Sequence, residues 1–544
     1  MTQHHGNLTG IMMVTLTCTI LTTAPAVAVD LIVQGVPTST IVISDQPSEA
    51  ASVAAVDLQM WLHKSSGAMV PIVPESEVAQ GAEEVLILVG DSQRARALGV
   101  DSDEFQLDEI LIKTFPRALV IVGDDERADG MVLEGTSFAV STFADEVLGV
   151  RFLWPGELGE IVPKRATLSV SDVAIRHKPV LRHRRLRNLQ IDEWLGEYVE
   201  ELGWKREDFD YRAEAAPWFR FHRIGGSYRG NYGHAFSRYW EWHQEDHPDW
   251  FALQPDGTRD NSPERGGGTR ARLCVSNPEL IAHVAQQAIE SLKKHPTMDC
   301  DSLSPNDASR TTHCRCDRCL GWDEPEARRI SIWEDGKPTE IVALTDRYVR
   351  FYSAVAEIVA VELPDRYLGA YAYESYYPPP VRAKLHPNVV IGITPLPKAY
   401  QHDDLREDLL ETWRGWSETA EQLFLRPNSL RALYNFPTVY VSPPGPGHAL
   451  LRRQRHALHR FRLPGELLVN ERTQLLRAGA IVVGSLPGCR GHHRRVLRSR
   501  LRPSRLCNPP LLRPHRAADD TDRRQAGLQD MEGGLRCAGS VLYG

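Results

Sequence analysis

Two acidic side chains follow apolar runs of the chain at positions where they could do acid–base chemistry. Asp307 closes the turn after the run 298–303, and Glu374 follows the run 367–372. If both runs are parallel barrel strands, both acids lie at the carboxyl ends, where barrel active sites are built. A pair of carboxyl groups can cleave a glycosidic bond, one as proton donor and the other as base or nucleophile. We therefore predict Asp307 as the acid and Glu374 as the base or nucleophile of a glycoside hydrolase. A turn-capping Asp and a solvated loop Glu are the structural alternatives.

Aromatic and hydrogen-bonding side chains gather in the same part of the chain. Sugar rings expose flat C–H faces on which aromatic rings pack, while polar neighbours bind the hydroxyl groups. Packing in the protein core is the alternative role for each of them. The predicted sugar-binding residues are His234, Tyr239, Trp240, Asn306, Tyr371 and Tyr373.

A dense group of cysteines forms the third candidate. Cys314, Cys316 and Cys319 stand in the segment CRCDRC, with Cys300 upstream and Cys274 further away. Thiolates at this spacing can bind a structural Zn²⁺, whereas an oxidising compartment favours disulfides, and free thiols are a third possibility. A closed thiolate site leaves no open position, so we expect no catalytic metal and no cofactor for the reaction.

The elements that must position these residues alternate between strand and helix from about residue 180 to 441. Such repetition predicts a parallel sheet, and its length predicts a (β/α)₈ TIM-like barrel, with a doubly wound open sheet as the alternative. No glycine-rich nucleotide fingerprint follows a strand, which argues against dinucleotide binding. The predicted strands are Arg184–Leu189, Thr269–Val275, Met298–Leu303, Tyr367–Tyr373, Val389–Thr394 and Leu430–Tyr434, and the predicted helices are Pro278–Lys294, Asp346–Val361 and Asp403–Leu423.

Residues 30–175 have the pattern of a small α/β accessory domain without a catalytic cluster. Short runs rich in Val and Ile predict strands, and apolar residues at helical spacing predict two helices. The predicted strands are Leu31–Val33, Thr40–Ile43, Val85–Val89, Ile110–Thr114 and Ala118–Val122, and the predicted helices are Glu49–Lys64 and Ser137–Leu148.

The N-terminus, residues 1–28, has the pattern of a signal peptide. The uncharged run Ile11–Leu21 is followed by Ala26, Val27 and Ala28, which have the small-residue spacing of a cleavage site. The run is too short for a comfortable membrane span. We therefore predict a secreted or periplasmic protein with no membrane span after signal removal; an apolar tail on a cytoplasmic protein is the alternative.

The C-terminus, residues 442–544, differs in composition from the remainder. Residues 451–544 hold 19 Arg, no Lys and 7 acidic residues, and their only aromatic residues are Phe461 and Tyr543. No strand or helix period persists there. A basic nucleic-acid-binding tail is one interpretation, but our hypothesis is a frameshift near residues 442–450, which leaves an out-of-frame, disordered tail and an incomplete barrel.

The composition of the whole chain is that of an ordinary globular protein. Of its 544 residues, 42% are hydrophobic and 25% charged, which excludes a wholly disordered chain or a multi-span membrane protein. The net charge of −8 does not suggest a nucleic-acid binder, so we expect no nucleic-acid partner.

Several motifs resemble those of known families. The stretch Leu148–Glu157, LGVRFLWPGE, resembles the end of the accessory domain that precedes the barrel in family-20 hexosaminidases and family-67 α-glucuronidases. The joint motifs are similar to those of a bacterial family numbered 4838 among domains of unknown function. They are GHAF (233–236), HPDWFAL (247–253), CVSNPEL (274–280), SLSPND (302–307), CRCDRC (314–319) and AYAYESYYPPP (370–380). The resemblance covers roughly residues 30–441. It implies a secreted protein with a hexosaminidase-like domain and a glycosidase-type barrel.

The leading hypothesis is therefore an exported glycoside hydrolase that acts on a polysaccharide or another glycan. Two other classes stay open. The first is a non-catalytic glycan-binding protein that uses the same barrel mouth, and the second is a structural-metal protein organised by its cysteines.

Overall fold

The computed structural model describes residues 28–185, 211–261, 267–308, 312–334, 337–395, 403–426 and 468–469. The predicted signal peptide before Ala28 and the predicted strand Leu430–Tyr434 lie outside the described residues. So does the tail 442–544, except for Leu468–Val469.

The N-terminal part of the chain contains a six-stranded mixed sheet. In spatial order its strands are β11 (Ala174–His177), β6 (Ile110–Phe115), β7 (Ala118–Gly123), β5 (Val85–Val89), β3 (Ser39–Ile43) and β4 (Ile72–Pro74). Strands β4, β3, β5 and β7 run parallel, whereas β6 is antiparallel to both β7 and β11. Every residue of β7 is buried, as expected of a strand covered on both faces.

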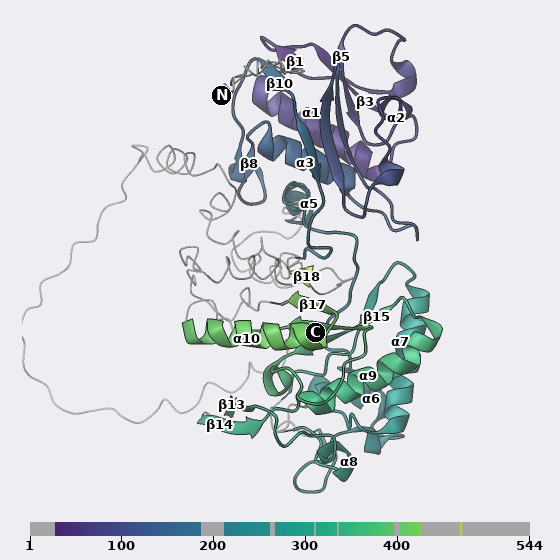
Figure 1. The fold of residues 1–544 in the computed structure, drawn as a ribbon, viewed down its shortest axis with the longest axis vertical. Helices are drawn as coiled ribbons and strands as arrows, with labels where there is room; N and C mark the ends of the chain where they lie inside the picture. Colours follow the sequence, from purple (N-terminus) through teal and green to yellow (C-terminus); the bar gives the residue numbers. More distant parts are fainter. Residues whose placement is uncertain are drawn as a thin grey trace, which may run out of the picture. The chain divides into compact units, whose positions relative to one another are not determined.

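Helices cover both faces of this sheet (Figure 1). Helices α1 (Glu49–Ser66) and α3 (Gly135–Glu146) share a core with one face, and α2 (Gln93–Ala97) packs on the other. Helix α1 begins where the Ser48 hydroxyl accepts a hydrogen bond from the Ala51 N–H, and it ends at Gly67, whose positive φ suits glycine. All strands and both helices predicted for residues 30–175 are present.

Smaller elements complete this part. Strand β1 (Ala28–Val33) lies between β10 (Leu168–Ser171) and β2 (Val36–Pro37) in a three-stranded sheet. Strand β8 (Arg151–Phe152) pairs with β9 (Glu160–Ile161). Helix α5 (Tyr211–Phe221) adds Trp218 and Phe221 to the core formed by α1 and α3.

The second large sheet is parallel throughout. Its order is β12 (Cys300–Ser302), β15 (Tyr367–Ala372), β16 (Val389–Ile393), β17 (Gln422–Leu425) and β18 (Leu468–Val469). Helices α7 (Pro278–Lys294), α9 (Thr345–Glu362) and α10 (Asp403–Thr419) connect or flank these strands, and their apolar residues share one core with one face of the sheet. The short helices α6 (Tyr239–His243) and α8 (Asp317–Leu320) and the hairpin β13 (Arg329–Glu334)–β14 (Lys337–Val342) lie in the connections.

The predicted α/β class is therefore confirmed, and the closed barrel stays a prediction, because the described strands form an open sheet. Two predicted elements were wrong. Residues 269–275 are not a strand: Gly268–Arg270 is a short 3₁₀ turn, and Leu273 makes only an isolated bridge to Phe251. The helix predicted to end at Leu423 ends at Thr419, and the apolar run that follows forms β17.

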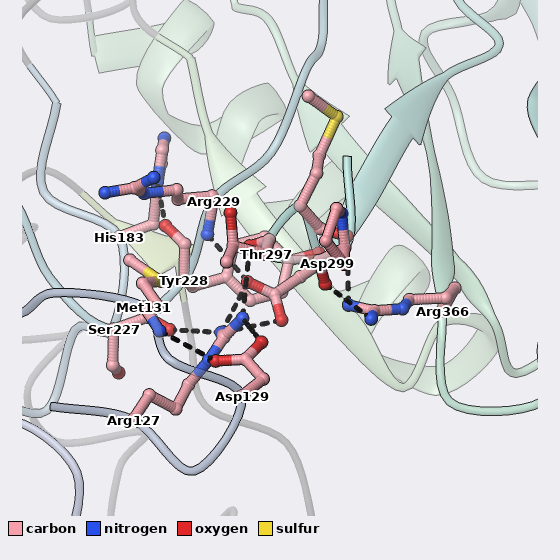
Figure 2. A network of polar contacts seen from close by, with 12 residues as sticks. Arg127, Asp129, Met131, His183, Ser227, Tyr228, Arg229, Thr297, Asp299 and Arg366 are labelled. Carbon is pink, nitrogen blue, oxygen red and sulfur yellow. Dashed lines mark hydrogen bonds and ion pairs between the residues drawn. The ribbon is translucent and has the colours of Figure 1, made fainter. Parts of the chain in front are cut away.

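Polar contacts join the two parts of the chain, which belong to one unit, Met1–Val482. Figure 2 shows Arg127, from the loop between β7 and α3, against Asp299 at the amino end of β12. Nη1 of Arg127 donates to both Asp299 oxygens at 2.8 Å, while Nη2 donates to Thr297 O at 3.1 Å and to Asp129 Oδ2 at 2.5 Å. These contacts lie at the end of the parallel sheet opposite to the carboxyl ends of its strands.

No helix among the described residues is both long and apolar enough to cross a membrane.

Candidate functional site

The pairing of two parallel strands places the loops that carry the predicted catalytic acids at the same edge of the sheet. Cys300 of β12 pairs with Tyr367 of β15, and the ladder continues to the hydrogen bond from Leu303 N to Gly369 O at 2.7 Å. Asp307 lies five residues beyond the end of β12, and Glu374 lies two residues beyond the end of β15. Both acids therefore follow the carboxyl ends of two neighbouring strands, and their catalytic roles stay a prediction.

A further parallel segment extends this edge. Gly230 bridges Cys300 and His234 bridges Ser304, so residues 230–234 lie beside β12 on the side away from β15. The sequence analysis missed this segment because it is rich in glycine and tyrosine and lacks the alternating apolar pattern of a strand. Its place in the sheet brings His234 to the same edge as the two acids.

The sheet face away from the helices is filled by aromatic rings. Tyr228, Tyr232, Tyr371 and Phe424 form a cluster with Cys300 and Val390 on this face. Two glycines make room for them: a Cβ at Gly369 would lie 2.5 Å from the Tyr232 ring, and one at Gly392 would lie 2.2 Å from the Phe424 ring. The sheet face next to the edge that carries the acids is therefore packed with side chains and, among the described residues, does not form an open channel.

Glu374 stands in an unusual backbone conformation. It has a φ of +46° at the first residue of the 3₁₀ turn η8 (Glu374–Tyr376), directly after β15. A non-glycine residue in this region is strained, and such strain concentrates at functional sites. The side chain of Glu374 is half-buried, as is that of Asp307.

A buried arginine links the loops that carry the two acids. Arg272 is 6% exposed, and its Nη2 donates to Ala308 O at 3.1 Å, one residue after Asp307. Its guanidinium also interacts with Glu374 and with the Tyr348 and Tyr376 hydroxyls; burial lowers the pKa of Arg272, but these groups outweigh it and raise the pKa. Nε and Nη1 of Arg272 have no hydrogen-bond partner among the described residues.

His313 lies next to this arginine. Its Nδ1 is 2.8 Å from the Tyr348 hydroxyl, and its Nε2 has no partner within the part of the chain that the structure describes. Burial, together with Arg272 and Arg347, lowers the pKa of His313 well below its ordinary value. Burial thus favours the neutral form of the imidazole, whereas the Arg272 guanidinium interacts electrostatically with Glu374.

Of the predicted sugar-binding residues, three lie where a ligand could reach them. His234 is exposed, with Nδ1 2.5 Å from Pro305 O, and Trp240 and Tyr373 are half-buried. Trp240 packs edge-on against Phe251 and lines a small cavity beside Arg272. His234 and Tyr373 adjoin the loops that carry the acids, and Trp240 lies at the cavity that Arg272 also lines.

The other three serve packing or positioning. Tyr239 is a core residue whose hydroxyl donates to Gln287 on α7 at 2.5 Å, so its predicted sugar-binding role is corrected to packing. Asn306 is 2% exposed and donates to Phe236 O and Ala271 O at 2.9 and 2.8 Å, which fixes the loop before Asp307. The Tyr371 ring is buried, with the half-buried Arg426 guanidinium 4.5 Å from its centre.

The cysteine prediction needs one correction. Cys300 points to the aromatic face of the sheet beside Tyr228 and Tyr232, apart from the other thiols. Cys274 takes its place: Cys274, Cys314, Cys316 and Cys319 have sulfur atoms that all lie within 4.8 Å of one another. All five of these cysteines are free thiols in the structure.

Sequence reasoning missed Arg272 and Arg426. Arg426 directly follows β17, and Arg272 directly precedes the apolar run Leu273–Val275, but arginines in such places are common and usually solvated. Only burial and the missing hydrogen-bond partners set Arg272 apart. A cavity of about 700 Å³ lies elsewhere, with Glu134, Arg220 and Tyr228 in its wall, and neither predicted acid lines it.

Comparison with known proteins finds one family model and several solved structures of low identity. A family model described as "Domain of unknown function (DUF4838)" matches residues 154–444. No curated protein matches the sequence.

Several solved structures are similar to this chain at low identity. An N-acetyl-β-hexosaminidase of Streptomyces plicatus is 13% identical, with a TM-score of 0.32 over 74% of this chain and 71% of that one. A chitobiase of Flavobacterium johnsoniae is 10% identical, with a TM-score of 0.38 over 83% and 66%. A β-N-acetylhexosaminidase of Bacteroides fragilis is 11% identical, with a TM-score of 0.34 over 73% and 72%.

Proposed function

The chain belongs to the DUF4838 family, as the sequence motifs predicted, and we propose from its own residues that it is a glycoside hydrolase that acts on a polysaccharide or another glycan. The observation that carries the proposal is that Asp307 and Glu374 follow the carboxyl ends of two neighbouring parallel strands, β12 and β15. Paired carboxyl groups at such an edge are the machinery that glycosidic-bond cleavage requires.

In this proposal Asp307 donates a proton to the oxygen of the leaving sugar as the glycosidic bond breaks. Glu374 either takes a proton from the attacking water or attacks the anomeric carbon itself; the separation of the two carboxyl groups in the substrate complex decides between inversion and retention. The strained φ of Glu374 supports its role, because the fold retains a conformation that a glycine would adopt more easily.

Arg272 acts as the positioning residue of this pair. Its bond to Ala308 O fixes the loop behind Asp307, and its charge attracts the carboxylate of Glu374. Asn306 fastens the same loop from the other side. His234, Trp240 and Tyr373 would contact the sugar, through hydrogen bonds and through stacking on its C–H face.

The test is a cleavage assay with the purified chain on a panel of polysaccharides and oligosaccharides, with new reducing ends quantified and products identified by mass spectrometry. We expect cleavage of one glycan class, and we expect Glu374→Gln and Asp307→Asn each to slow it by about 10²–10⁴-fold. The matched control is Asp365→Asn, an exposed acid just before the amino end of β15. Binding without cleavage would support the glycan-binding alternative, and undiminished cleavage by both variants would reject the assignment.

Export is the second part of the proposal. A cut after Ala28 would leave Val29 as the first residue, and its pairing with Val170 between β1 and β10 would be retained. We expect N-terminal sequencing of the protein from the secreting bacterium to begin at Val29 in the periplasmic or culture fraction. An uncleaved cytoplasmic chain would contradict export.

A further inference from the structure

Four thiols from two distant stretches of the chain converge next to the candidate site. Cys274 precedes α7, and Cys314, Cys316 and Cys319 lie between β12 and the end of α8. Their sulfur atoms all lie within 4.8 Å of one another. The Cys274 Sγ is 3.6 Å from that of Cys316 and 3.9 Å from that of Cys319. Three of the four side chains are buried, and Cys316 is partly exposed.

The spacing of the sulfur atoms is that of a tetrahedral metal site. A Zn–S bond of about 2.3 Å places the sulfurs at the corners of a tetrahedron whose edges are about 3.8 Å. The two distances from Cys274 lie on either side of this value. A disulfide would instead require sulfur atoms about 2.05 Å apart.

Hydrogen-bond donors surround the sulfur atoms, as they do around bound thiolates. The Leu253 N–H donates to Cys314 Sγ at 3.2 Å, and the Ser276 hydroxyl lies 3.1 Å from Cys319 Sγ. Such donors stabilise negative charge on sulfur, which four neutral thiols would not need.

Arg259 supplies compensating charge, and Arg347 lies beside the site in an ion pair with Asp323. Four thiolates around one Zn²⁺ carry a net charge of −2, which must be balanced in a buried place. Arg259 interacts electrostatically with Cys274, Cys314 and Cys316, and its Nη1 donates to Asp249 O at 3.3 Å. Arg347 is 3% exposed, donates to Cys314 O at 2.8 Å and is paired with Asp323.

We propose that Cys274, Cys314, Cys316 and Cys319 bind one structural Zn²⁺ that fastens the loops beside the candidate site. Four protein ligands close the coordination shell, so the ion has no position for substrate.

The ion would join two irregular segments, around Cys274 and Cys314–Cys319, that both share backbone hydrogen bonds with residues 250–253. Cys274 N donates to Trp250 O at 2.7 Å, Ala252 N to Arg272 O at 3.0 Å, and Arg315 N to Leu253 O at 2.9 Å. Arg272 stands two residues before the first ligand, and the other three follow Asp307 by at most twelve residues. The zinc thus holds in place a region that has few regular elements to stabilise it.

The test measures metal in the full chain, purified without chelators and without added reductant. Elemental analysis should give one zinc per chain, and X-ray absorption at the zinc edge should give four sulfur neighbours at about 2.3 Å. Removal of zinc by a chelator after partial unfolding should lower the melting temperature, and zinc, but not magnesium, should restore it. Disulfides found by non-reducing mass spectrometry, or free thiols without metal, would overturn the proposal.

A pair of matched variants assigns the ligands. Cys316→Ser changes the least buried of the four thiols and should reduce bound zinc to background. Cys300→Ser changes a fully buried thiol outside the cluster and should keep one zinc per chain, even if it destabilises the fold. Full zinc in the Cys316 variant would reject the site. Because zinc content does not depend on turnover, this result is independent of the hydrolase proposal.

Discussion

Polar side chains inside the N-terminal part of the chain have partners there, whereas several at the carboxyl edge of the parallel sheet do not. Asp125 illustrates the first region: it accepts hydrogen bonds from Ser48 Oγ at 2.6 Å and from Thr136 N and Oγ at 2.7 and 2.8 Å. Within the described residues 28–177, a single buried side-chain atom, Asp124 Oδ2, has no partner.

The second part of the chain contains more such atoms, both around the two acids and elsewhere. Around Asp307 and Glu374, buried polar atoms without a partner among the described residues belong to Arg272, Asn306, His313, Tyr352 and Ser375. Each such group destabilises a fold by about 1–3 kcal/mol unless something else satisfies it. The contrast indicates that the first region is organised for stability and the second retains groups that a bound molecule can use.

The largest effect on cleavage is expected at Glu374, where a substitution tests the contrast between the two regions. Glu374→Gly removes the carboxyl group and the strained backbone together, so cleavage should fall by about 10²–10⁴-fold. Glycine adopts a φ of +46° without strain, so the free energy of unfolding should equal or exceed that of Glu374→Gln. Chemical denaturation of the two variants checks this. A Gly variant less stable than the Gln variant by more than about 1 kcal/mol would assign Glu374 a structural role.

Truncation of a core side chain in the first region should instead lower the stability of the fold without changing the cleavage rate. Leu58 on α1 is fully buried, so Leu58→Ala should lower the free energy of unfolding by about 2–5 kcal/mol. The cleavage rate per folded molecule should not change. Leu158→Ala, at a position 81% exposed, is the control and should leave both quantities unchanged. If Leu58→Ala also lowered the cleavage rate per folded molecule, stability and cleavage could not be assigned to separate regions of the chain.

Two buried arginines allow the contrast to be tested within the second region. Arg272 has unsatisfied N–H groups, so Arg272→Met should slow cleavage by about 10²-fold and leave the free energy of unfolding unchanged or higher. Arg347 is paired with Asp323, so Arg347→Met should destabilise the fold by about 2–3 kcal/mol. Equal destabilisation by both substitutions would remove Arg272 from the proposed site.

The smallest expected effect concerns Asp124 in the first region. Burial raises the pKa of Asp124 to about 6, above its ordinary value of 3.8. A carboxyl group with a raised pKa in the folded state stabilises the fold below pH 3.8, and this contribution is lost as the pH rises through 6. Asparagine resembles the protonated acid, so Asp124→Asn should gain stability relative to the native chain between pH 4 and 7.5, by about 1 kcal/mol because the group is half solvated. A difference in melting temperature between Asp124→Asn and the native chain that does not change with pH would contradict this prediction.

Local signals in the sequence identified much of the fold. An apolar face at helical spacing predicted α7 with both of its ends, because this period acts within one helix, and the structure adds a cap at Asn277. Strand β17 escaped prediction because its apolar residues continue the helical run of α10 with a short connection. Residues 269–275 looked like a strand because buried loops and buried strands are equally apolar.

Of the candidate site, the sequence predicted the two acids, because they follow strand ends. The rule for parallel barrels singled out Asp307 and Glu374, but no local pattern distinguishes Arg272 from a solvated arginine. Cys274 is 40 residues from Cys314, so only the fold brings it into the thiol cluster in place of Cys300. The burial of Arg272 and the place of Cys274 in the thiol cluster both depend on contacts between segments that are distant in the sequence. The spacing of residues along one segment therefore could not predict them.

The most direct measurement is a double-mutant cycle on glycan cleavage with Asp307→Asn, Glu374→Gln and the double variant. Residues that act on one bond as a unit have strongly non-additive effects. If the two carboxyl groups converge on one glycosidic bond, the double variant should be about as slow as the slower single variant. Two losses that multiply, or a single variant with the native rate, would show that the pair does not form one active site.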